Sequence, residues 1–336
     1  MGSKWSKYFQ YGKESTRGTL VAATRVWTGE EVMVTPDTEP QRVTGEVFGV
    51  RAASRRPNVQ QFQTNMTLSN QNGIFQQLPF LFLCGLKGGV TGSEVTSAQA
   101  DYLWTFSPSF TAANDPDSFT GEWDLNGQEW EAGYCMFKEI RISGEISQGA
   151  APSPVKVEAD FFGRKSAKST KTGSLSLHTP VGMNARNARL YIDTSWAGIG
   201  GTEAAAQLRS FDLTIITGAQ PEDYGSARED FDAHSESIIA WNLGFTIKSG
   251  TESAALYDAL RAQTTKYFRL DIPGPQIGSG TNHRFRFDGS GLLTDASPDG
   301  SEDRNTNLSS FTVEDLYDDT GAKHMALAVT TNNNAI

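Results

Sequence analysis

The chain has 336 residues, 38% hydrophobic and 20% charged, with a formal net charge of −10. This composition belongs to a folded chain with room for two domains of about 150 residues, and it excludes an intrinsically disordered protein. Residues 1–175 hold 17 Lys and Arg against 18 Asp and Glu, whereas residues 176–336 hold 12 against 21. A nucleic-acid grip needs clustered cations, so the acidic half argues against one and is compatible with a surface past which a polyanion slides.

The sequence gives no sign of a membrane segment or of a disulfide framework. No apolar stretch follows Lys4 and Lys7, as a secretory signal peptide would require, and the apolar run at 78–84 is too short to span a bilayer. We therefore expect no membrane anchor. Cys84 and Cys135 lack metal-site spacing, which indicates two buried or free thiols.

The first half begins with a polar arm and a long excursion. Residues 1–18 form the arm, with aromatic residues at 5, 8, 9 and 11, and we expect it to be disordered or to dock on a neighbouring molecule. A strand begins at 32–34. Residues 36–58 then form an excursion that is basic near its end, at Arg51, Arg55 and Arg56.

The rest of the first half contains one apolar helix. Residues 74–83, after a possible cap at Asn70 or Asn72, are apolar nearly all round, which predicts a helix buried between domains or subunits. A strand resumes at 103–106, inside an extra stretch at 85–136. Small polar residues at 166–178 are typical of a linker.

The second half repeats this order. Strands are predicted at 211–213 and 241–247, separated by an acidic excursion at 216–236. A helix follows at 254–260, capped by Ser249 or Thr251, and a strand at 267–272 ends before Pro273. The opposite charges of the two excursions indicate either that they meet between subunits or that they are two unrelated solvated loops.

Residues 18–68 and 197–247 are two copies of one unit at a constant offset of 179 residues. At this offset Phe62 falls on Trp241, Thr64 on Leu243, Met66 on Phe245, Leu68 on Ile247, Val32 on Phe211 and Val34 on Leu213. Two later matches need shifts: 140–144 beside 285–289, and 157–158 beside 313–314. The repeat predicts a tandem duplication with a first domain at 1–178, carrying the arm and the insertion 85–136, and a second at 179–336.

The predicted fold class is therefore mainly β (β-rich α+β). Each domain is expected to be a β-sandwich or open barrel with one flanking helix.

Motifs for chemistry are missing from the sequence. There is no phosphate-binding loop and no nucleophile elbow, and the glycine run at 198–201 has Glu203 where a dinucleotide fingerprint needs its last glycine. The four histidines, at 178, 234, 283 and 324, have no metal-ligand spacing, and the acidic runs at 124–131 and 295–303 do not fit a calcium loop. We predict no catalytic residue, no cofactor and no metal site, and hence no enzymatic activity.

Four stretches resemble the tail tube proteins (major tail proteins) of long-tailed bacteriophages. They are 12–24 (GKESTRGTLVAAT), 190–213 (LYIDT, the glycine turn AGIGG and LRSFDL), 254–270 (AALYDALR and TKYFRL) and 284–291 (RFRFDGSG). Residues 85–136 and the stretch after Asp318 match the family pattern poorly.

The resemblance implies a structural virion protein, assembled in the bacterial cytoplasm into the phage tail. Family members form hexameric rings that stack into a tube through which double-stranded DNA passes without specific binding. Because this chain carries two copies of the unit, three chains would make one pseudo-sixfold ring. The implied partners are further copies of the chain and other tail proteins, namely the tape measure, tail tip and terminator proteins.

Two other readings stay open. A tail terminator or a type VI secretion tube subunit would share the tube fold. A two-domain β-sandwich that binds carbohydrate would instead use surface aromatics such as Trp123 and Trp130.

Overall fold

The computed structural model describes residues 8–29, 31–35, 41–42, 57–58, 62–125, 127–147, 151–175, 179–204, 208–226, 228–303 and 306–336. Within these residues the chain is mainly β with two α-helices, as the alternating apolar pattern predicts. Arg51, Arg55, Arg56, His178 and the predicted domain boundary after residue 178 lie outside the described residues.

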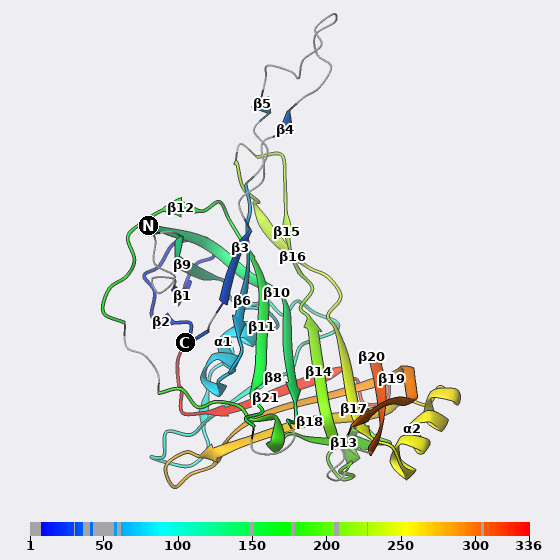
Figure 1. Cartoon of the computed structure of the whole chain (residues 1–336). Coiled ribbons are helices and arrows are strands. Elements are labelled where there is room, and N and C mark those ends of the chain that lie inside the picture. The colour runs from blue at the N-terminus through cyan, green and yellow to red at the C-terminus, as the bar shows by residue number, and fades with distance from the viewer. Residues whose placement is uncertain are drawn as a thin grey trace, which may run out of the picture.

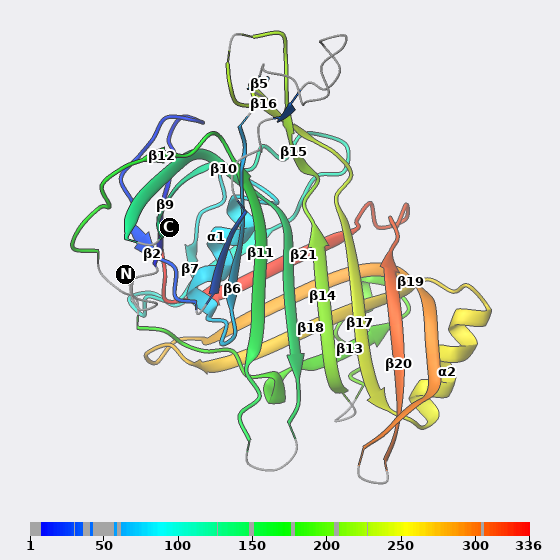
Figure 2. The same ribbon diagram turned by 45° about the horizontal axis from the view of Figure 1, so that its top comes forward.

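The largest sheet is antiparallel throughout, in the spatial order β3, β6, β11, β10, β14, β17, β20 and β19 (Figure 2). We call it the large sheet. Its strands are β3 (Glu31–Thr35), β6 (Thr64–Asn70), β11 (Val155–Gly163), β10 (Gln128–Glu145), β14 (Leu208–Ile216), β17 (Ala240–Lys248), β20 (Thr306–Asp315) and β19 (Asn282–Asp303). β10 and β19 contribute only their second halves, because the first half of each belongs to a smaller sheet.

Two smaller sheets complete the core. One contains β2 (Arg25–Val26), β1 (Phe9–Lys13), β9 (Phe119–Leu125), the first half of β10 and β12 (Ala167–Lys168). The other contains β13 (Arg189–Asp193), β18 (Lys266–Gln276), the first half of β19, β21 (Met325–Thr331), β8 (Tyr102–Phe106) and β7 (Ser93–Glu94). In Figure 2 β18, β13 and β21 run crosswise behind the upright strands of the large sheet.

The strand order of the first half recurs in the second. β1, β3, β6, β9, β10, β11 and β12 have the same neighbours as β13, β14, β17, β18, β19, β20 and β21, respectively. A helix follows β6 in one half, α1 (Leu78–Leu83), and β17 in the other, α2 (Thr251–Arg261). The residues matched at the constant offset lie on the equivalent pairs β3 with β14 and β6 with β17, apart from Phe62, which precedes β6.

Of the two shifted matches, that of 157–158 with 313–314 falls on the equivalent strands β11 and β20, whereas that of 140–144 with 285–289 is wrong. Residues 140–144 pair with β11 and β14 in the large sheet, whereas 285–289 pair with β18 and β21 and thus correspond to the first half of β10. The interpretation of 85–136 as an insertion is also wrong in part. β9 and the start of β10 have counterparts in the second half, and the β7–β8 hairpin is the portion of that stretch without one in the described chain.

The two halves share one hydrophobic core. β10 pairs with β14 from Glu139–Ile216 to Glu145–Ser210, and β8 of the first half pairs with β21 of the second. The buried cluster runs continuously from Phe9 to Val329.

Helix α1 lies inside this core, and all six of its residues are buried. Phe80 stacks on Tyr11 with ring centroids 3.6 Å apart and meets Phe119 and Phe137 edge-on. The prediction of a buried apolar helix is confirmed. Its predicted cap is wrong, because Gln77 is the N-cap residue and makes no side-chain cap bond, while Asn70 binds the carbonyl of Thr28 instead.

Three further predictions are corrected by the structure. Phe9 and Tyr11 are buried on β1, so this part of the arm is a core strand. The N-cap of α2 is Gly250 rather than Ser249 or Thr251. β18 continues through Pro273, which pairs with Arg284; β13 reaches only as far as Asp271, so the missing N–H of the proline removes no bond to that neighbour.

Both long excursions contain a two-stranded ribbon. These are β4 (Gln41–Arg42) with β5 (Pro57–Asn58), and β15 (Ala219–Glu222) with β16 (Ala233–Glu236). Figure 1 shows the two ribbons at the same end of the large sheet. Part of the acidic excursion already has partners within the chain, since Glu229 pairs with Lys165 at 2.5 Å and Asp230 lies 3.9 Å from Arg164.

Cys84 and Cys135 are free and buried, as predicted, and burial raises the pKa of both thiols well above the ordinary value. Among the described residues, neither helix has the length and apolar character needed to cross a bilayer.

We predict that Phe80→Ala lowers the free energy of unfolding by about 3–5 kcal/mol, because it leaves a cavity among Tyr11, Phe119 and Phe137. Denaturant unfolding measures the loss. Ile238→Ala is the control: its side chain is 81% exposed, and its change should stay within about 0.5 kcal/mol. Equal losses for both variants would contradict the central place of α1.

Candidate functional site: the uncovered face of the large sheet

Side chains of the large sheet alternate between the core and a second, uncovered face. On β14 the core side takes Phe211, Leu213 and Ile215, and on β17 it takes Trp241, Leu243, Phe245 and Ile247. The positions between them are small and polar. We call the outward set the polar face; with its charged members set aside, it includes Asn65, Thr67, Ser143, Ser210, Thr214, Asn242, Gly244, Thr246, Ser310 and Thr312.

Charged residues on the polar face are mostly acidic. Counting only residues whose side chains the structure describes, its regular outward positions carry seven carboxylates against three cations: Glu139, Glu145, Glu158, Asp160, Asp212, Asp295 and Glu314 against Arg141, Lys156 and Lys248. Two more cations, Lys138 and Arg209, stand at β-bulges. The face is therefore net acidic even when these two are counted.

Two of the three cations are held by carboxylates of the same face. Arg141 donates from Nε to Asp212 Oδ1 at 2.8 Å and from its second nitrogen to the other oxygen, across the junction between β10 and β14. This bidentate contact raises the pKa of Arg141. Lys156 Nζ lies 2.7 Å from Glu158 Oε1. Among the described residues Glu139, Glu145 and Glu314 make no ion pair, so their charges stay uncompensated.

The outward strand positions lack the groups that would hold a nucleic acid. Binding of single strands uses aromatic rings for base stacking, and binding of duplexes uses clusters of Lys and Arg along the phosphates. At the described outward positions Phe162 is the aromatic residue, and it is buried with Met136 against Phe231. The other large apolar side chains there are Ile216, Leu292 and Leu308. None of these described residues offers an exposed ring for base stacking. A polyanion facing this surface meets repulsion and few sites of attachment.

The aromatic residues considered for carbohydrate binding do not form a surface platform. Trp123 is only 2% exposed and faces the core, which contradicts its expected surface position. Trp130 packs partly against the same core. The structure therefore withdraws Trp123 from the carbohydrate-binding alternative and leaves Trp130 half-buried.

Buried carboxylates in the first small sheet are structural. Glu14 accepts hydrogen bonds from the backbone N–H groups of Gly18 and Tyr134 and from the hydroxyl groups of Ser118 and Thr120. Glu122 is satisfied in the same way by Gln10, Ala23 and Thr172. Since the environment meets each charge with several donors, these two residues hold the sheet together.

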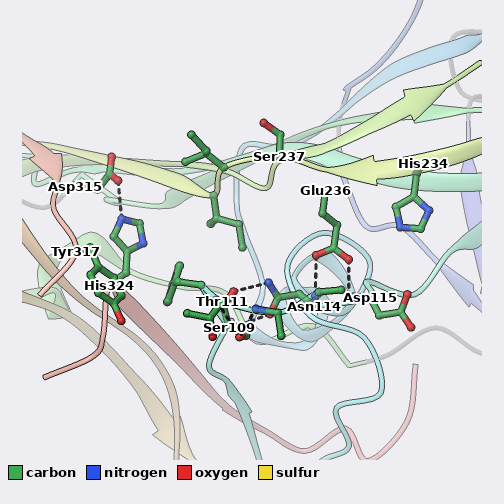
Figure 3. Close-up of a pocket in the computed structure, with 15 residues that line it drawn as sticks. Ser109, Thr111, Asn114, Asp115, His234, Glu236, Ser237, Asp315, Tyr317 and His324 are labelled. Atoms are coloured by element: carbon green, nitrogen blue, oxygen red, sulfur yellow. Dashed lines mark hydrogen bonds and ion pairs between the residues drawn. The ribbon is translucent and has the colours of Figure 1, made fainter. Parts of the chain in front are cut away.

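Asp115, His234 and Glu236 converge in a cluster that was not predicted from the sequence. Their potential ligand atoms lie within 4.8 Å of one another at the edge of a cavity of about 1080 Å³ (Figure 3). Each side chain already has a protein partner. Glu236 accepts the backbone N–H groups of Asn114 and Asp115, both at 2.7 Å; Asp115 pairs with Arg17 at 2.6 Å; and Nδ1 of His234 lies 3.1 Å from the hydroxyl of Tyr134.

We interpret this cluster as a structural contact that holds the loop at 109–117 against β16. His283 and His324 lie elsewhere, against Phe75 and beside Asp315. The glycine run at 198–201 is a turn, as expected, in which Asp193 accepts the N–H groups of Gly200 and Thr202.

No protein-family model and no curated protein matches this sequence.

We predict that His234 makes stability depend on pH. Burial, and then the charge of Arg17, lower its pKa below the ordinary value of about 6.5, so the unfolded chain binds the proton more readily than the folded one. Its contribution is complete above about pH 6.5 and declines as the pH falls towards the folded pKa. Urea unfolding between pH 7.5 and 5 should show a smaller decline for His234→Gln than for the wild-type protein. Parallel curves would contradict this role.

Proposed function

We propose that this protein is the structural subunit of a phage tail tube, in which three chains form a pseudo-sixfold ring and rings stack around a channel for double-stranded DNA. The observation that carries the proposal is the large sheet. Two four-strand repeats lie side by side in it, and its outward face is polar, net acidic and, among the described residues, without an exposed ring for base stacking.

The edges of the large sheet support a ring. β3 and the second half of β19 have a strand partner on one side within this sheet, and such edges invite pairing with another chain. β3 is the counterpart of β14, and β19 is the counterpart of β10. The pairing of β10 with β14 inside the chain therefore serves as a template for the pairing of β19 with β3 of the next chain. A heterologous contact of this kind forms a closed ring when its rotation closes.

The ribbons support stacking of such rings. β4–β5 and β15–β16 occupy equivalent places in the two repeats and project at one end of the large sheet (Figure 1). Three chains would present six ribbons to the adjoining ring. In this proposal the protein acts in the virion tail, after assembly in the bacterial cytoplasm, beside tape measure, tail tip and terminator proteins. For this role we assign it no catalytic residue, cofactor or metal.

Electron microscopy of the purified protein at rising concentration, with and without tail-tip complexes as seeds, tests the proposal. Hollow tubes support it, whereas monomers that persist even with seeds would contradict it.

We predict that the acidic polar face keeps DNA mobile in the channel. Glu145→Lys/Glu314→Lys replaces two exposed carboxylates on the polar face by cations, so assembled tubes should retain duplex DNA in a filter-binding assay at low salt and release it as salt rises. Glu94→Lys/Asp319→Lys makes the same charge change at exposed positions off this face and should retain much less. Equal retention by both variants would show that the polar face does not line the channel.

A further inference from the structure

The two helices occupy equivalent positions in the two repeats but have different surroundings. At the offset of 179 residues Phe80 corresponds to Ala259, and both are buried against their own half of the chain. Phe82 corresponds to Arg261. Phe82 is fully buried, whereas Arg261 is exposed. The repeat thus has a helix face that is covered in one copy and open in the other.

The cover of α1 and of the short turn before it comes from the second half together with β8, whose Phe106 meets Phe82 edge-on at 5.5 Å. The ring of Phe82 stacks on Phe285 with centroids 6.0 Å apart, and Phe75 stacks on His283 at 5.5 Å. Gln76 donates to the side-chain oxygen of Asn332 at 3.1 Å. The receiving surface consists of β19 and the segment after β21.

No described residue covers the corresponding face of α2. Ser253, Leu256 and Ala259 pack inward, while Ala254, Ala255, Tyr257, Asp258 and Arg261 are exposed. Figure 2 shows α2 at one end of the large sheet and β9 with β12 at the other, so a single chain cannot bring the two together.

We propose that the outer face of α2 docks on the sheet of β1, β9, β10 and β12 of a second copy of the chain, as α1 docks on the second half of its own chain. This inference rests on the ring of the proposed function. The occupant follows from the repeat, because the first-half counterparts of β18, β19 and β21 are β9, β10 and β12.

The chemistry of the two surfaces is complementary. Near the β9–β10 turn the sheet presents the half-buried ring of Trp130, with Lys168 Nζ 6.0 Å from its centroid. Helix α2 presents Asp258, which suits Lys168, and Arg261, which suits an aromatic ring. Where α1 buries phenylalanine rings, α2 offers charged groups. The contact between chains is therefore weaker and more sensitive to salt than the contact within the chain.

Paired cysteines test the docking directly. Asp258→Cys/Lys168→Cys places one exposed thiol on each surface, and both native cysteines are buried and do not compete. With a short bismaleimide, assembled protein should give covalent dimers and trimers on a denaturing gel. Each single variant, and the control pair Asp258→Cys/Glu94→Cys, should remain monomeric.

The possible results separate this inference from the proposed function. Rings or tubes without cross-linked chains would overturn the docking and leave the tube. Absence of any assembly, in the variants and in the wild-type protein, would overturn both. As a second measurement, Asp258→Lys should raise the concentration needed for assembly roughly five-fold, and adding Lys168→Asp should reverse the change. No reversal would overturn the docking.

Discussion

The pairing of β10 with β14 is the interaction on which the rest of the structure depends. It joins the last strand of one four-strand unit to the first strand of the next, and Arg141 and Asp212 bridge the joint on the polar face. Without this pairing the chain would be two small open sheets. With it, one continuous sheet separates a shared apolar core from a polar surface. The counterparts of β10 and β14, which are β19 and β3, form the two free edges of this sheet.

The helices of the two repeats, α1 and α2, have different surroundings. Inside the chain the joint is sealed by α1, whose rings pack among Tyr11, Phe106, Phe119, Phe137 and Phe285. At the free end of the large sheet α2 is polar on its outer side. The strongly apolar helix α1 is thus buried within the chain, whereas the exposed surface of α2 is polar. In the proposed ring, this difference would leave the contact between chains weaker than the contact between the two halves of one chain.

The repeat was readable from the sequence where strands bury one face only. Leu68, Ile247 and Leu213 alternate with polar neighbours and so give a regular pattern. β9 and the start of β10 gave no such pattern, because Glu122 is buried among Gln10 and Thr172 while Trp123 is buried in the core. When a strand buries polar side chains on one face and apolar side chains on the other, its sequence resembles that of an acidic loop. β1 was missed for the same reason, since Gln10 is as deeply buried as Phe9 and Tyr11.

The candidate site, too, could be predicted from the sequence only in part. The acidic bias of the second half was visible in the composition, but the polar face also draws Glu139, Glu145 and Glu158 from the first half, which is nearly neutral as a whole. The cluster of Asp115, His234 and Glu236 could not be predicted, because Asp115 lies more than a hundred residues before the other two and meets them only through the packing of a loop on β16.

The rotational symmetry of the assembled ring tests this account most directly. Electron cryomicroscopy of the assembled protein would measure it together with the number of chains per ring. The account predicts threefold rings in which the large sheets of three chains join, β19 to β3, into one continuous barrel with the polar face inward. Rings of six whole chains, or rings in which β3 and β19 stay unpaired, would contradict it.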